Sequence, residues 1–263
     1  MYAIKALAYS FKGNYRENNE DNYYINGKFM KEEHTDNLDK TFVFGDKASL
    51  FGVFDGLGGE DKGETASYIA AKTLSEFKEN FDSDVYFKRA NEEICKLYQE
   101  NTKKRIGTTA CIVSIKGKKA TVANIGDSKI FLFRKGKLLQ LSEEHTTLSA
   151  MLKSGVLTND DISKFGLKNS LSQCLGIRES EMIIKPYSCD VGQIQNGDIF
   201  LICSDGVSNG VSDDEICSIL KKKNNFAKKI VEKAVSNGSK DNATAVVIKV
   251  YKGLFRVIGG FLH

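Results

Sequence analysis

The apolar positions of this chain follow two periods, one of two residues and one of about 3.6 residues. Tyr2 to Phe11 alternates loosely between apolar and polar residues, which predicts a strand. Ser49 to Phe54 is a short apolar run between turn residues, which indicates a buried strand, although its pattern alone does not exclude a buried helical segment. Further strands are predicted at 41–44, 108–115, 120–125, 129–133, 138–141, 181–185, 198–203 and 243–251. The run 41–44 is suited to pair with 49–54, and the runs between 108 and 141 favour an antiparallel meander.

Helical spacing dominates two longer segments. From Glu64 to Phe77 apolar residues recur three and four positions apart, which predicts a helix beginning near Glu60. Asp84 to Lys103 repeats the pattern, and shorter helices are predicted at 148–152, 213–220 and 226–235. Because the helices come in pairs and do not alternate with the strands, the order favours an α+β layered or sandwich domain of antiparallel sheets over a doubly wound parallel sheet.

Length and composition indicate one large domain. The chain has 263 residues, of which 41% are hydrophobic and 27% charged, as in ordinary globular proteins. It has one proline, Pro186, and no repeat or low-complexity segment, so no linker is predicted. We interpret residues 1–251 as a single domain with an irregular insert or flap at about 142–189, followed by a short tail at 252–263.

Charge and cysteine usage limit the partners and the compartment. The formal net charge of +4, from 38 basic and 34 acidic residues, is too small for a nucleic-acid-binding surface. The six cysteines form no Cys-x-x-Cys pair, and most lie in apolar stretches, as expected of reduced, buried thiols. No apolar run approaches the ~20 residues of a membrane span, and the first residues lack the layout of a signal peptide. We therefore expect a cytoplasmic protein without a membrane span or nucleic-acid partner.

The chemistry is predicted to centre on Asp55, which follows the strand 49–54 directly. Gly56, Gly58 and Gly59 come next, and they allow a sharp turn and a close approach to a ligand. The alternative is that Asp55 only caps the following helix. Acidic residues recur at predicted strand ends, at Glu20 with Asp21, at Asp55, Asp127, Asp205 and Asp241.

Such a set favours hard divalent cations. Clustered carboxylates repel one another unless cations lie among them, and oxygen ligands select Mg²⁺ or Mn²⁺. Zinc is not favoured, because the chain has only three histidines, at 34, 145 and 263, and no paired cysteines.

Two other motifs compete for the chemistry. Gly58 to Thr65 has the spacing of a phosphate-binding P-loop, but Glu64 replaces the required lysine and would repel phosphate. Gly206-x-Ser208-x-Gly210 fits the nucleophile elbow of serine hydrolases. However, Ser208 lies several residues beyond the predicted strand end, and the only histidine after it is His263, so this hydrolase is a distant alternative.

Six motifs in order carry a resemblance to a known family. They are Arg16-x-x-Asn19-Glu20-Asp21, Phe54-Asp55-Gly56-x-Gly58-Gly59, Gly107-Thr108-Thr109-Ala110, Asn124-x-Gly126-Asp127-Ser128, Ser204-Asp205-Gly206 and Asp241-Asn242-x-Thr244. Over about residues 2–250 the chain resembles the metal-dependent Ser/Thr protein phosphatases, the type 2C or PPM family, in its compact bacterial form. The resemblance implies a four-layer α-β-β-α sandwich of two antiparallel sheets flanked by helix pairs. It also implies hydrolysis of phosphoserine and phosphothreonine by a water that bridges two divalent metal ions.

The resemblance also implies roles for individual residues. Two Mn²⁺ or Mg²⁺ ions would be bound by Glu20, Asp55 (bridging), the Gly56 carbonyl, Asp205 and Asp241. Asp21 would anchor metal-bound water, and Asp127 is similar to the ligand of a third, weaker ion. Arg16 would bind the phosphate through its two-pronged guanidinium. Gly107 to Ala110 and Asn242 are interpreted as architectural residues behind the ligands.

The chain departs from the family at two positions. Leu57 stands where many eukaryotic members have a histidine proposed as general acid, so the proton for the leaving group must come from water or another group. Lys129 replaces the usual arginine, with an expected effect on packing or surface charge. Similarity to the bacterial members further implies a Ser/Thr protein kinase as partner, phosphorylated proteins as substrates, and a monomer. Because all ligands are present, an active enzyme is favoured over a catalytically silent, metal-bound interaction module.

Overall fold

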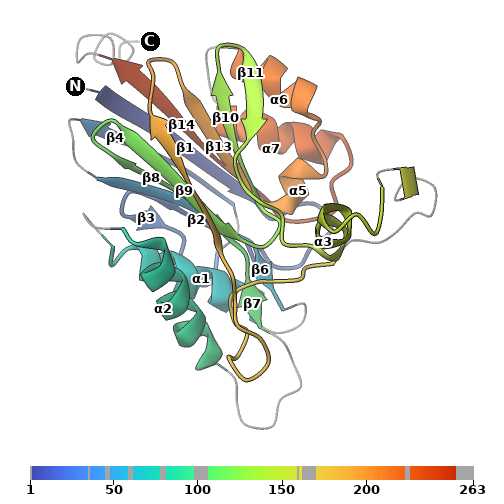
Figure 1. Cartoon of the computed structure of the whole chain (residues 1–263). Helices are drawn as coiled ribbons and strands as arrows, with labels where there is room; N and C mark the ends of the chain where they lie inside the picture. Colours follow the sequence, from blue (N-terminus) through green and yellow to red (C-terminus); the bar gives the residue numbers. More distant parts are fainter. Residues whose placement is uncertain are drawn as a thin grey trace.

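Two six-stranded antiparallel sheets lie face to face at the centre of the molecule (Figure 1). The computed structural model describes residues 2–34, 36–44, 48–58, 62–77, 81–97, 106–158, 160–161, 170–222 and 226–252. The first sheet has the order β11 (Lys137–Gln140), β10 (Lys129–Arg134), β13 (Ile199–Cys203), β14 (Ala243–Lys252), β1 (Tyr2–Phe11) and β4 (Asn37–Phe44). The second has the order β12 (Tyr187–Gln193), β9 (Lys119–Ile125), β8 (Ala110–Lys116), β5 (Ser49–Phe54), β2 (Asn22–Ile25) and β3 (Lys28–Phe29). A small ladder joins β6 (Gly56–Leu57) to β7 (Gly107–Thr108).

Helices cover both outer faces of this sandwich. On the second sheet lie α1 (Gly63–Leu74) and α2 (Ser83–Cys95), and on the first lie α5 (Asp205–Ser208), α6 (Asp213–Leu220) and α7 (Phe226–Ser236). The short helix α3 (Thr147–Lys153) stands beside one end of the sheets (Figure 1). The predicted α+β sandwich with helix pairs on the outside is therefore confirmed.

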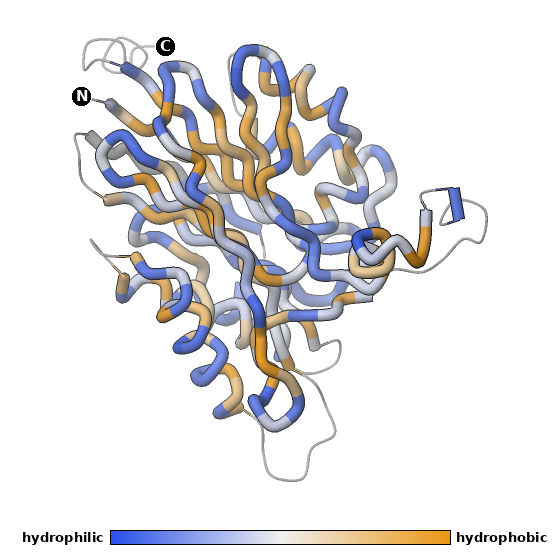
Figure 2. Tube along the Cα trace, viewed as in Figure 1, coloured by the Kyte–Doolittle hydropathy of each residue, from blue (hydrophilic) through white to orange (hydrophobic). Residues whose placement is uncertain are grey.

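Strand β5 is buried on both faces, which explains its almost wholly apolar sequence. Phe51 and Val53 point into the core between the sheets, whereas Leu50 and Phe54 pack against α1 and α2. Successive strand residues point to opposite faces, and here both faces are covered, so every position is buried. Figure 2 shows the same concentration of hydrophobic residues along the strands of the sandwich.

Several strand partners differ from the predicted ones. Strand β4 pairs with β1, not with β5, so the two runs 41–44 and 49–54 lie in different sheets. The meander is interrupted after β9, because the chain crosses at Gly126 and Asp127 to the other sheet, where β10 pairs with β13. Gly126 has φ +100°, a conformation that suits glycine and lets the chain turn here.

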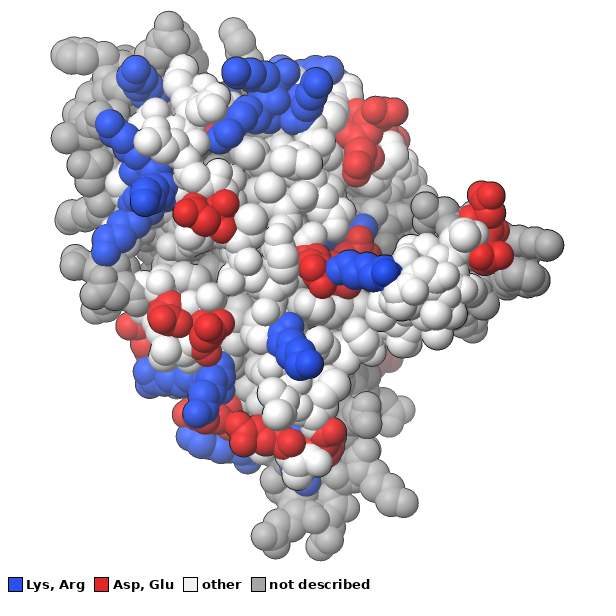
Figure 3. Space-filling model, in the orientation of Figure 1, with Lys and Arg blue, Asp and Glu red and all other residues white. Residues whose placement is uncertain are grey.

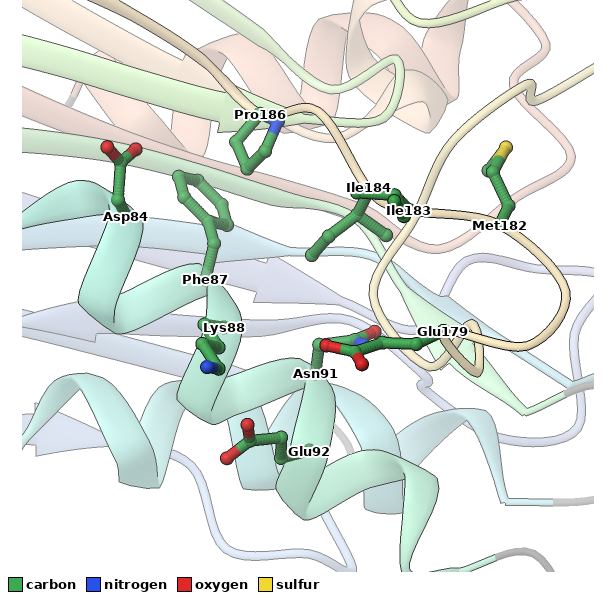
Figure 4. A pocket seen from close by; sticks show the side chains of 10 residues that line it. All are labelled: Asp84, Phe87, Lys88, Asn91, Glu92, Glu179, Met182, Ile183, Ile184 and Pro186. Carbon is green, nitrogen blue, oxygen red and sulfur yellow. The ribbon is translucent and has the colours of Figure 1, made fainter.

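The predicted strand at 181–185 is wrong. The segment is irregular and lies over α2, where Asn91 donates to the Ile177 carbonyl at 2.8 Å and accepts from the Gly176 N–H at 2.7 Å. Strand β12 begins only at Tyr187, after Pro186, which has no N–H for a ladder. Phe87, Ile184 and Pro186 line a cavity of about 250 Å³ between this segment and α2 (Figure 4).

The helix limits also differ from the predicted ones. Helix α1 begins at Gly63 and ends at Leu74, short of both predicted ends, and α2 ends at Cys95. Most of the predicted continuation of α2 to residue 103 falls outside the described residues, as do Gly59, part of the flap and residues 253–263. The division into domain, flap and tail stays a prediction. Among the helices described, none is long and apolar enough to cross a membrane.

Candidate active site

The predicted acidic residues meet at one end of the sandwich. Asp55 follows β5, Asp205 follows β13 and Asp241 precedes β14, and the strand registers place these three ends together. Asp127 follows β9 at the same end, and the loop after β1 contributes Arg16, Glu20 and Asp21. Burial raises the pKa of Asp55 well above its usual range, and four nearby carboxylates add to the increase: Asp21, Asp205, Asp127 and Asp241. The sequence therefore predicted a set of side chains that lie together in space.

Asp55 is fixed by the Gly-Thr-Thr-Ala motif. Its N–H donates to Thr109 Oγ1 at 3.0 Å, and its carbonyl accepts from Thr109 N at 2.9 Å and from Thr108 Oγ1 at 2.9 Å. Thr109 Oγ1 in turn shares a hydrogen bond with Ser128 Oγ at 2.7 Å. Helix α1 begins after Lys62 without a side-chain cap, so Asp55 is not the cap of that helix. The architectural interpretation of residues 107–110 agrees with these contacts, whereas the contact of Ser128 was not predicted.

Glycines permit a close crossing of three segments beside Asp55. Gly56 N donates to the Glu20 carbonyl at 3.1 Å, and a Cβ on Gly56 would collide with that carbonyl and with the carbonyl of Gly63. A Cβ on Gly63 would lie 2.7 Å from Glu20 Cδ. Gly63 was not predicted as a site residue, because its requirement depends on Glu20, far away in sequence. The start of α1 thus leaves space for the Glu20 carboxylate, a position that favours negative charge.

Asn242 ties the loop that carries Arg16 and Glu20 to the start of β14. Its Nδ2 donates to the Lys12 carbonyl at 2.6 Å and to the Asn18 carbonyl at 2.9 Å, and its Oδ1 accepts from Glu20 N at 2.8 Å. The side chain is 5% exposed. Asn242 therefore holds the backbone on both sides of Arg16, as its predicted architectural role requires.

Asp21 is buried behind the other carboxylates, with 1% exposure. Ser204 Oγ donates to its Oδ2 at 2.8 Å, while Oδ1 is buried without a hydrogen-bond partner among the described residues. Burial, partly offset by hydrogen bonds from Thr244 and Ser204, raises the pKa of Asp21 to about 7. A buried carboxylate oxygen without a donor indicates that an electropositive group is needed beside it.

Arg16 contacts a predicted metal ligand. Its Nη2 lies 2.6 Å from Asp241 Oδ2, and both side chains are partly exposed. Burial and the nearby carboxylate of Asp241 raise the pKa of Asp205, and the side chain of Asp55 also lies close to it. Within the described residues, no three Asp, Glu, His or Cys side chains already stand in a metal-coordinating arrangement. Arg16 thus offsets part of the negative charge at this end of the sandwich.

Asp127 lies beside an ion pair that joins β10 to the segment after β11. Lys129 Nζ is 3.0 Å from Glu144 Oε1. Burial raises the pKa of Asp127 to about 6; Glu144 adds to this increase, and Lys129 opposes it. His145 Nδ1 accepts from Gly126 N at 3.1 Å, and the backbone N–H of His145 donates to the Gly126 carbonyl at 2.9 Å. His145 was not predicted to take part. Its role lies in holding the turn that presents Asp127.

The donor set fits divalent cations. The acidic side chains at this end are carboxylates, with the unpartnered Asp21 Oδ1 behind them. All donors are hard oxygen atoms, as Mg²⁺ and Mn²⁺ require. A groove of about 610 Å³ opens next to them, and Arg16, Asp205, Asp241 and Lys240 are among its lining residues.

The serine hydrolase alternative has no support. Ser208 lies at the end of α5, one helical turn after Asp205, and its Oγ is buried without a hydrogen-bond partner in the described part of the chain. A nucleophilic serine needs a base within hydrogen-bond reach. Leu57, which replaces the eukaryotic histidine, lines a separate groove with Cys174 and Met182.

The raised pKa values predict the pH dependence of the metal-free protein. Burial raises the pKa of Glu20 to about 7, of Asp21 to about 7 and of Asp127 to about 6, all above their unfolded values. The folded state therefore holds protons that the unfolded chain has lost, so stability falls as pH rises through this window.

We expect the Tm measured in chelator to be higher at pH 6 than at pH 8. His145, whose pKa burial lowers, opposes this trend only weakly, as one group against three. Saturating Mn²⁺ should remove the dependence, because cations then replace the protons. A Tm in chelator that rises from pH 6 to pH 8 would contradict the assignment.

Comparison with known proteins places this geometry in a family. A family model described as protein phosphatase 2C matches residues 12–150. The serine/threonine phosphatase stp of Listeria innocua is 28% identical over 256 residues, covering 90% of this chain and 92% of the relative. The crystal structure of the Mycobacterium tuberculosis phosphatase PstP/Ppp superimposes with a TM-score of 0.77 at 23% identity, covering 95% of this chain and 100% of that one. The catalytic domain of PstP in complex with two manganese ions gives 0.74 at 24% identity, covering 96% and 100%.

The fold and the matched motifs thus define a phosphatase, a hydrolase of the metal-dependent Ser/Thr type. The chain belongs to the protein phosphatase 2C family. The resemblance stated from the sequence is confirmed, and the catalytically silent and serine hydrolase alternatives find no support in these relatives.

Proposed function

We propose that this chain removes phosphate from phosphoserine and phosphothreonine in proteins, at the acidic end of its sandwich. The observation that carries the proposal is the convergence of Asp55, Asp127, Asp205 and Asp241 beside Arg16, with a buried, unpartnered Asp21 oxygen behind them. The names of the bacterial relatives support the substrate class. In the described chain the nucleophilic alternative, Ser208, has no base in reach.

Two Mn²⁺ or Mg²⁺ ions are proposed as cofactors. Glu20, Asp55, the Gly56 carbonyl, Asp205 and Asp241 would hold them. When bound, such ions acidify water and neutralise phosphate charge. The two manganese ions of the PstP catalytic domain support this number. The test is hydrolysis of a phosphothreonine peptide by dialysed protein with Mn²⁺ and with EDTA. Full activity in EDTA would overturn the proposal.

The other residues have separate tasks. Arg16 is placed to hold phosphoryl oxygens from the edge of the groove, and Asp21 to accept a hydrogen bond from water near the ions. Asn242 keeps the Arg16 loop against β14. Residues 142–189 are assigned to substrate selection as a flap on the single domain 1–251. Thr146 caps α3 at the base of that flap through a 3.2 Å bond from Ser149 N.

The physiological setting is also part of the proposal. We infer a cytoplasmic monomer that reverses the action of a Ser/Thr protein kinase, with the kinase itself among its substrates. This inference rests on similarity to compact bacterial members such as PhpP of Streptococcus pneumoniae, which is 29% identical over 257 residues. Gel filtration with light scattering and dephosphorylation of an autophosphorylated kinase test it directly.

Replacing Arg16 with alanine is expected to lower kcat/KM about ten- to a hundred-fold while two metal ions still bind. A charge-assisted hydrogen bond contributes about 1.5–3 kcal/mol, and a lysine cannot reproduce the two-pronged geometry. Arg89→Ala is the matched control, because Arg89 is 51% exposed against 49% for Arg16 and is also paired with a carboxylate, Glu76. An unchanged kcat/KM removes Arg16 from the site, and loss of metal in calorimetry makes it structural.

The variant Asp127→Ala tests whether Asp127 binds only a third ion and not the first two. Two ions should still bind tightly, because the other ligands are untouched, whereas turnover should fall. We propose that the proton for the leaving group is donated near Asp127, because the Leu57 side chain has no proton to donate. The loss should be large for phosphopeptides, whose alkoxide needs a proton, and small for p-nitrophenyl phosphate. Equal losses on both substrates contradict the proton role, and loss of the two tight ions contradicts the ligand assignment.

A further inference from the structure

Tyr15 and Lys240 adjoin the proposed phosphate site. Tyr15 precedes Arg16 in the chain and Lys240 precedes Asp241, so each is the neighbour of one member of the Arg16–Asp241 ion pair. Lys240 Nζ lies 5.8 Å from the centroid of the Tyr15 ring, and Tyr15 is 66% exposed. Both residues line the groove of about 610 Å³ that Arg16, Asp205 and Asp241 also line. We call them the Tyr15–Lys240 pair.

Backbone contacts hold the two segments that carry the pair against each other. Gly13, with φ +85°, crosses the Asp241 carbonyl so closely that a Cβ would lie 2.5 Å from it. Ser239 Oγ donates to the Gly206 carbonyl at 2.7 Å, which fixes the segment before Lys240 to the start of α5. The fold therefore places the two side chains of the pair next to each other at the edge of the groove.

On the proposed assignment, Lys240 is the charge in this groove that remains for the substrate. The charged lining residues are Arg16, Lys240, Asp205 and Asp241. Metal ions would bind the two carboxylates, and the phosphoryl group would bind Arg16. Among the described residues Lys240 takes part in no ion pair. A lysine beside the phosphate position is complementary to a second negative group on the substrate.

The rest of the surface gives little selection by charge. The formal net charge is only +4, and Figure 3 shows basic side chains beside acidic ones at several places on the visible face. The groove that contains Leu57 has Glu181 as the only charged residue among its described lining residues, and Glu181 would repel an acidic side chain. The groove at Lys240 is therefore the one suited to an acidic substrate.

The reach of an extended peptide fits this arrangement. Neighbouring Cα atoms are about 3.8 Å apart, so Lys240 stands one residue from Asp241, which Arg16 Nη2 contacts at 2.6 Å. Residues of an extended peptide advance about 3.3 Å each, so a residue one or two positions from the phosphorylated one lies within about 7 Å of it. The flexible four-carbon stem of a lysine spans such a distance.

We propose that the Tyr15–Lys240 pair makes the phosphatase prefer sites with an acidic residue one or two positions from the phosphorylated residue. The Lys240 ammonium pairs with the aspartate or glutamate of the substrate, and the negative face of the Tyr15 ring holds that ammonium at the groove. Lys240 is thus a specificity-determining residue and Tyr15 a positioning residue. The inference rests on the proposed phosphatase function and adds a substrate preference to it.

The experiment measures kcat and KM at saturating Mn²⁺ for phosphothreonine peptides that differ at one position. Glutamate, alanine or lysine is placed in turn at each of the two positions before and after the phosphothreonine. For the unchanged chain we expect kcat/KM for the glutamate peptide to exceed that for the lysine peptide about three- to five-fold at one position or more, mainly through KM, because exposed ion pairs are weak. The ratio should approach one at high salt.

Variants assign the preference to the pair. Lys240→Glu should invert the ratio, so that the lysine peptide becomes the better substrate. Tyr15→Phe should keep the ratio and Tyr15→Leu should lower it, because only an aromatic ring offers a face to the ammonium. The matched control is Lys72→Glu on α1, where Lys72 Nζ lies 5.9 Å from the Tyr68 ring. Neither Lys72 nor Tyr68 lines the groove, so this control should keep the ratio of the unchanged chain.

A ratio taken within one variant cancels any general loss of activity. An unchanged ratio in Lys240→Glu, the same inversion in Lys72→Glu, or equal ratios in the two Tyr15 variants would overturn the proposal. A preference for a second phosphothreonine without any preference for glutamate would also overturn it, since the groove would then select phosphate. If no peptide were hydrolysed with Mn²⁺ present, the proposed function itself would be contradicted, and the inference with it.

Discussion

Replacing Asp55 with asparagine is expected to lower kcat/KM on phosphopeptides by at least about a hundred- to a thousand-fold, comparable with removal of a central electrostatic group from other active sites. The change keeps the shape of the side chain and removes one charge. Burial and the carboxylates of Asp21, Asp205, Asp127 and Asp241 all raise the pKa of Asp55, and on the proposed assignment Asp55 would hold both cations. The measurement is kcat/KM at saturating Mn²⁺, together with metal content by calorimetry.

The same substitution should stabilise the metal-free protein. Without cations, burial and the neighbouring carboxylates disfavour the charged form of Asp55, so a neutral asparagine of the same shape removes this cost. Asp198→Asn is the matched control: Asp198 is buried but bound to Arg134, so its loss should destabilise the fold and leave kcat/KM intact. Normal activity in Asp55→Asn, or a lower Tm than the unchanged protein in chelator, would refute the central role of Asp55.

Asn242→Ala should be the most damaging change outside the proposed ligands. Three hydrogen bonds disappear at once, and the carbonyl groups of Lys12 and Asn18 and the N–H of Glu20 lose their partner. We expect the free energy of unfolding to fall by about 2–4 kcal/mol, and the affinity for metal ions to fall because Glu20 is released. Urea unfolding and Mn²⁺ titration measure the two effects.

Helix α2 offers a control with the same chemistry. Asn91 also makes three hydrogen bonds to backbone groups, and it is 6% exposed against 5% for Asn242. Asn91→Ala should cost similar stability without changing metal affinity, because Asn91 lies by the cavity of Figure 4 and not among the acidic residues. If both variants lose metal affinity alike, the effect of Asn242 is a general loss of stability.

The sequence predicted the layers of the fold better than the pairing of strands. An apolar run such as 49–54 reports that both faces are covered, but it carries no information about which strand lies beside it. The pairing of β4 with β1 and of β10 with β13 depends on long-range packing between sheets. The segment 181–185 looked like a strand, but Pro186 follows it, and the preceding residues Gly176 and Ile177 are hydrogen-bonded to Asn91 of α2.

The sequence predicted the acidic residues of the site but not the residues that hold them in place. Carboxylates beside glycine at strand ends leave a local signature, which is why Asp55, Asp127 and Asp205 could be found. Ser128, Ser204 and Gly63 have no such signature, since each matters only through a partner distant in the sequence, as Ser204 does through its 2.8 Å bond to Asp21. The contact of Arg16 with Asp241 was not predicted either.

That contact has a thermodynamic consequence. On the proposed assignment, the guanidinium of Arg16 and a metal ion compete for the Asp241 carboxylate, from which Arg16 Nη2 is 2.6 Å away. An ion that wins this competition also frees the arginine to meet a phosphate, so each ligand raises the affinity of the protein for the other by the same factor. On this assignment, the protein would bind phosphate tightly only after it has bound metal.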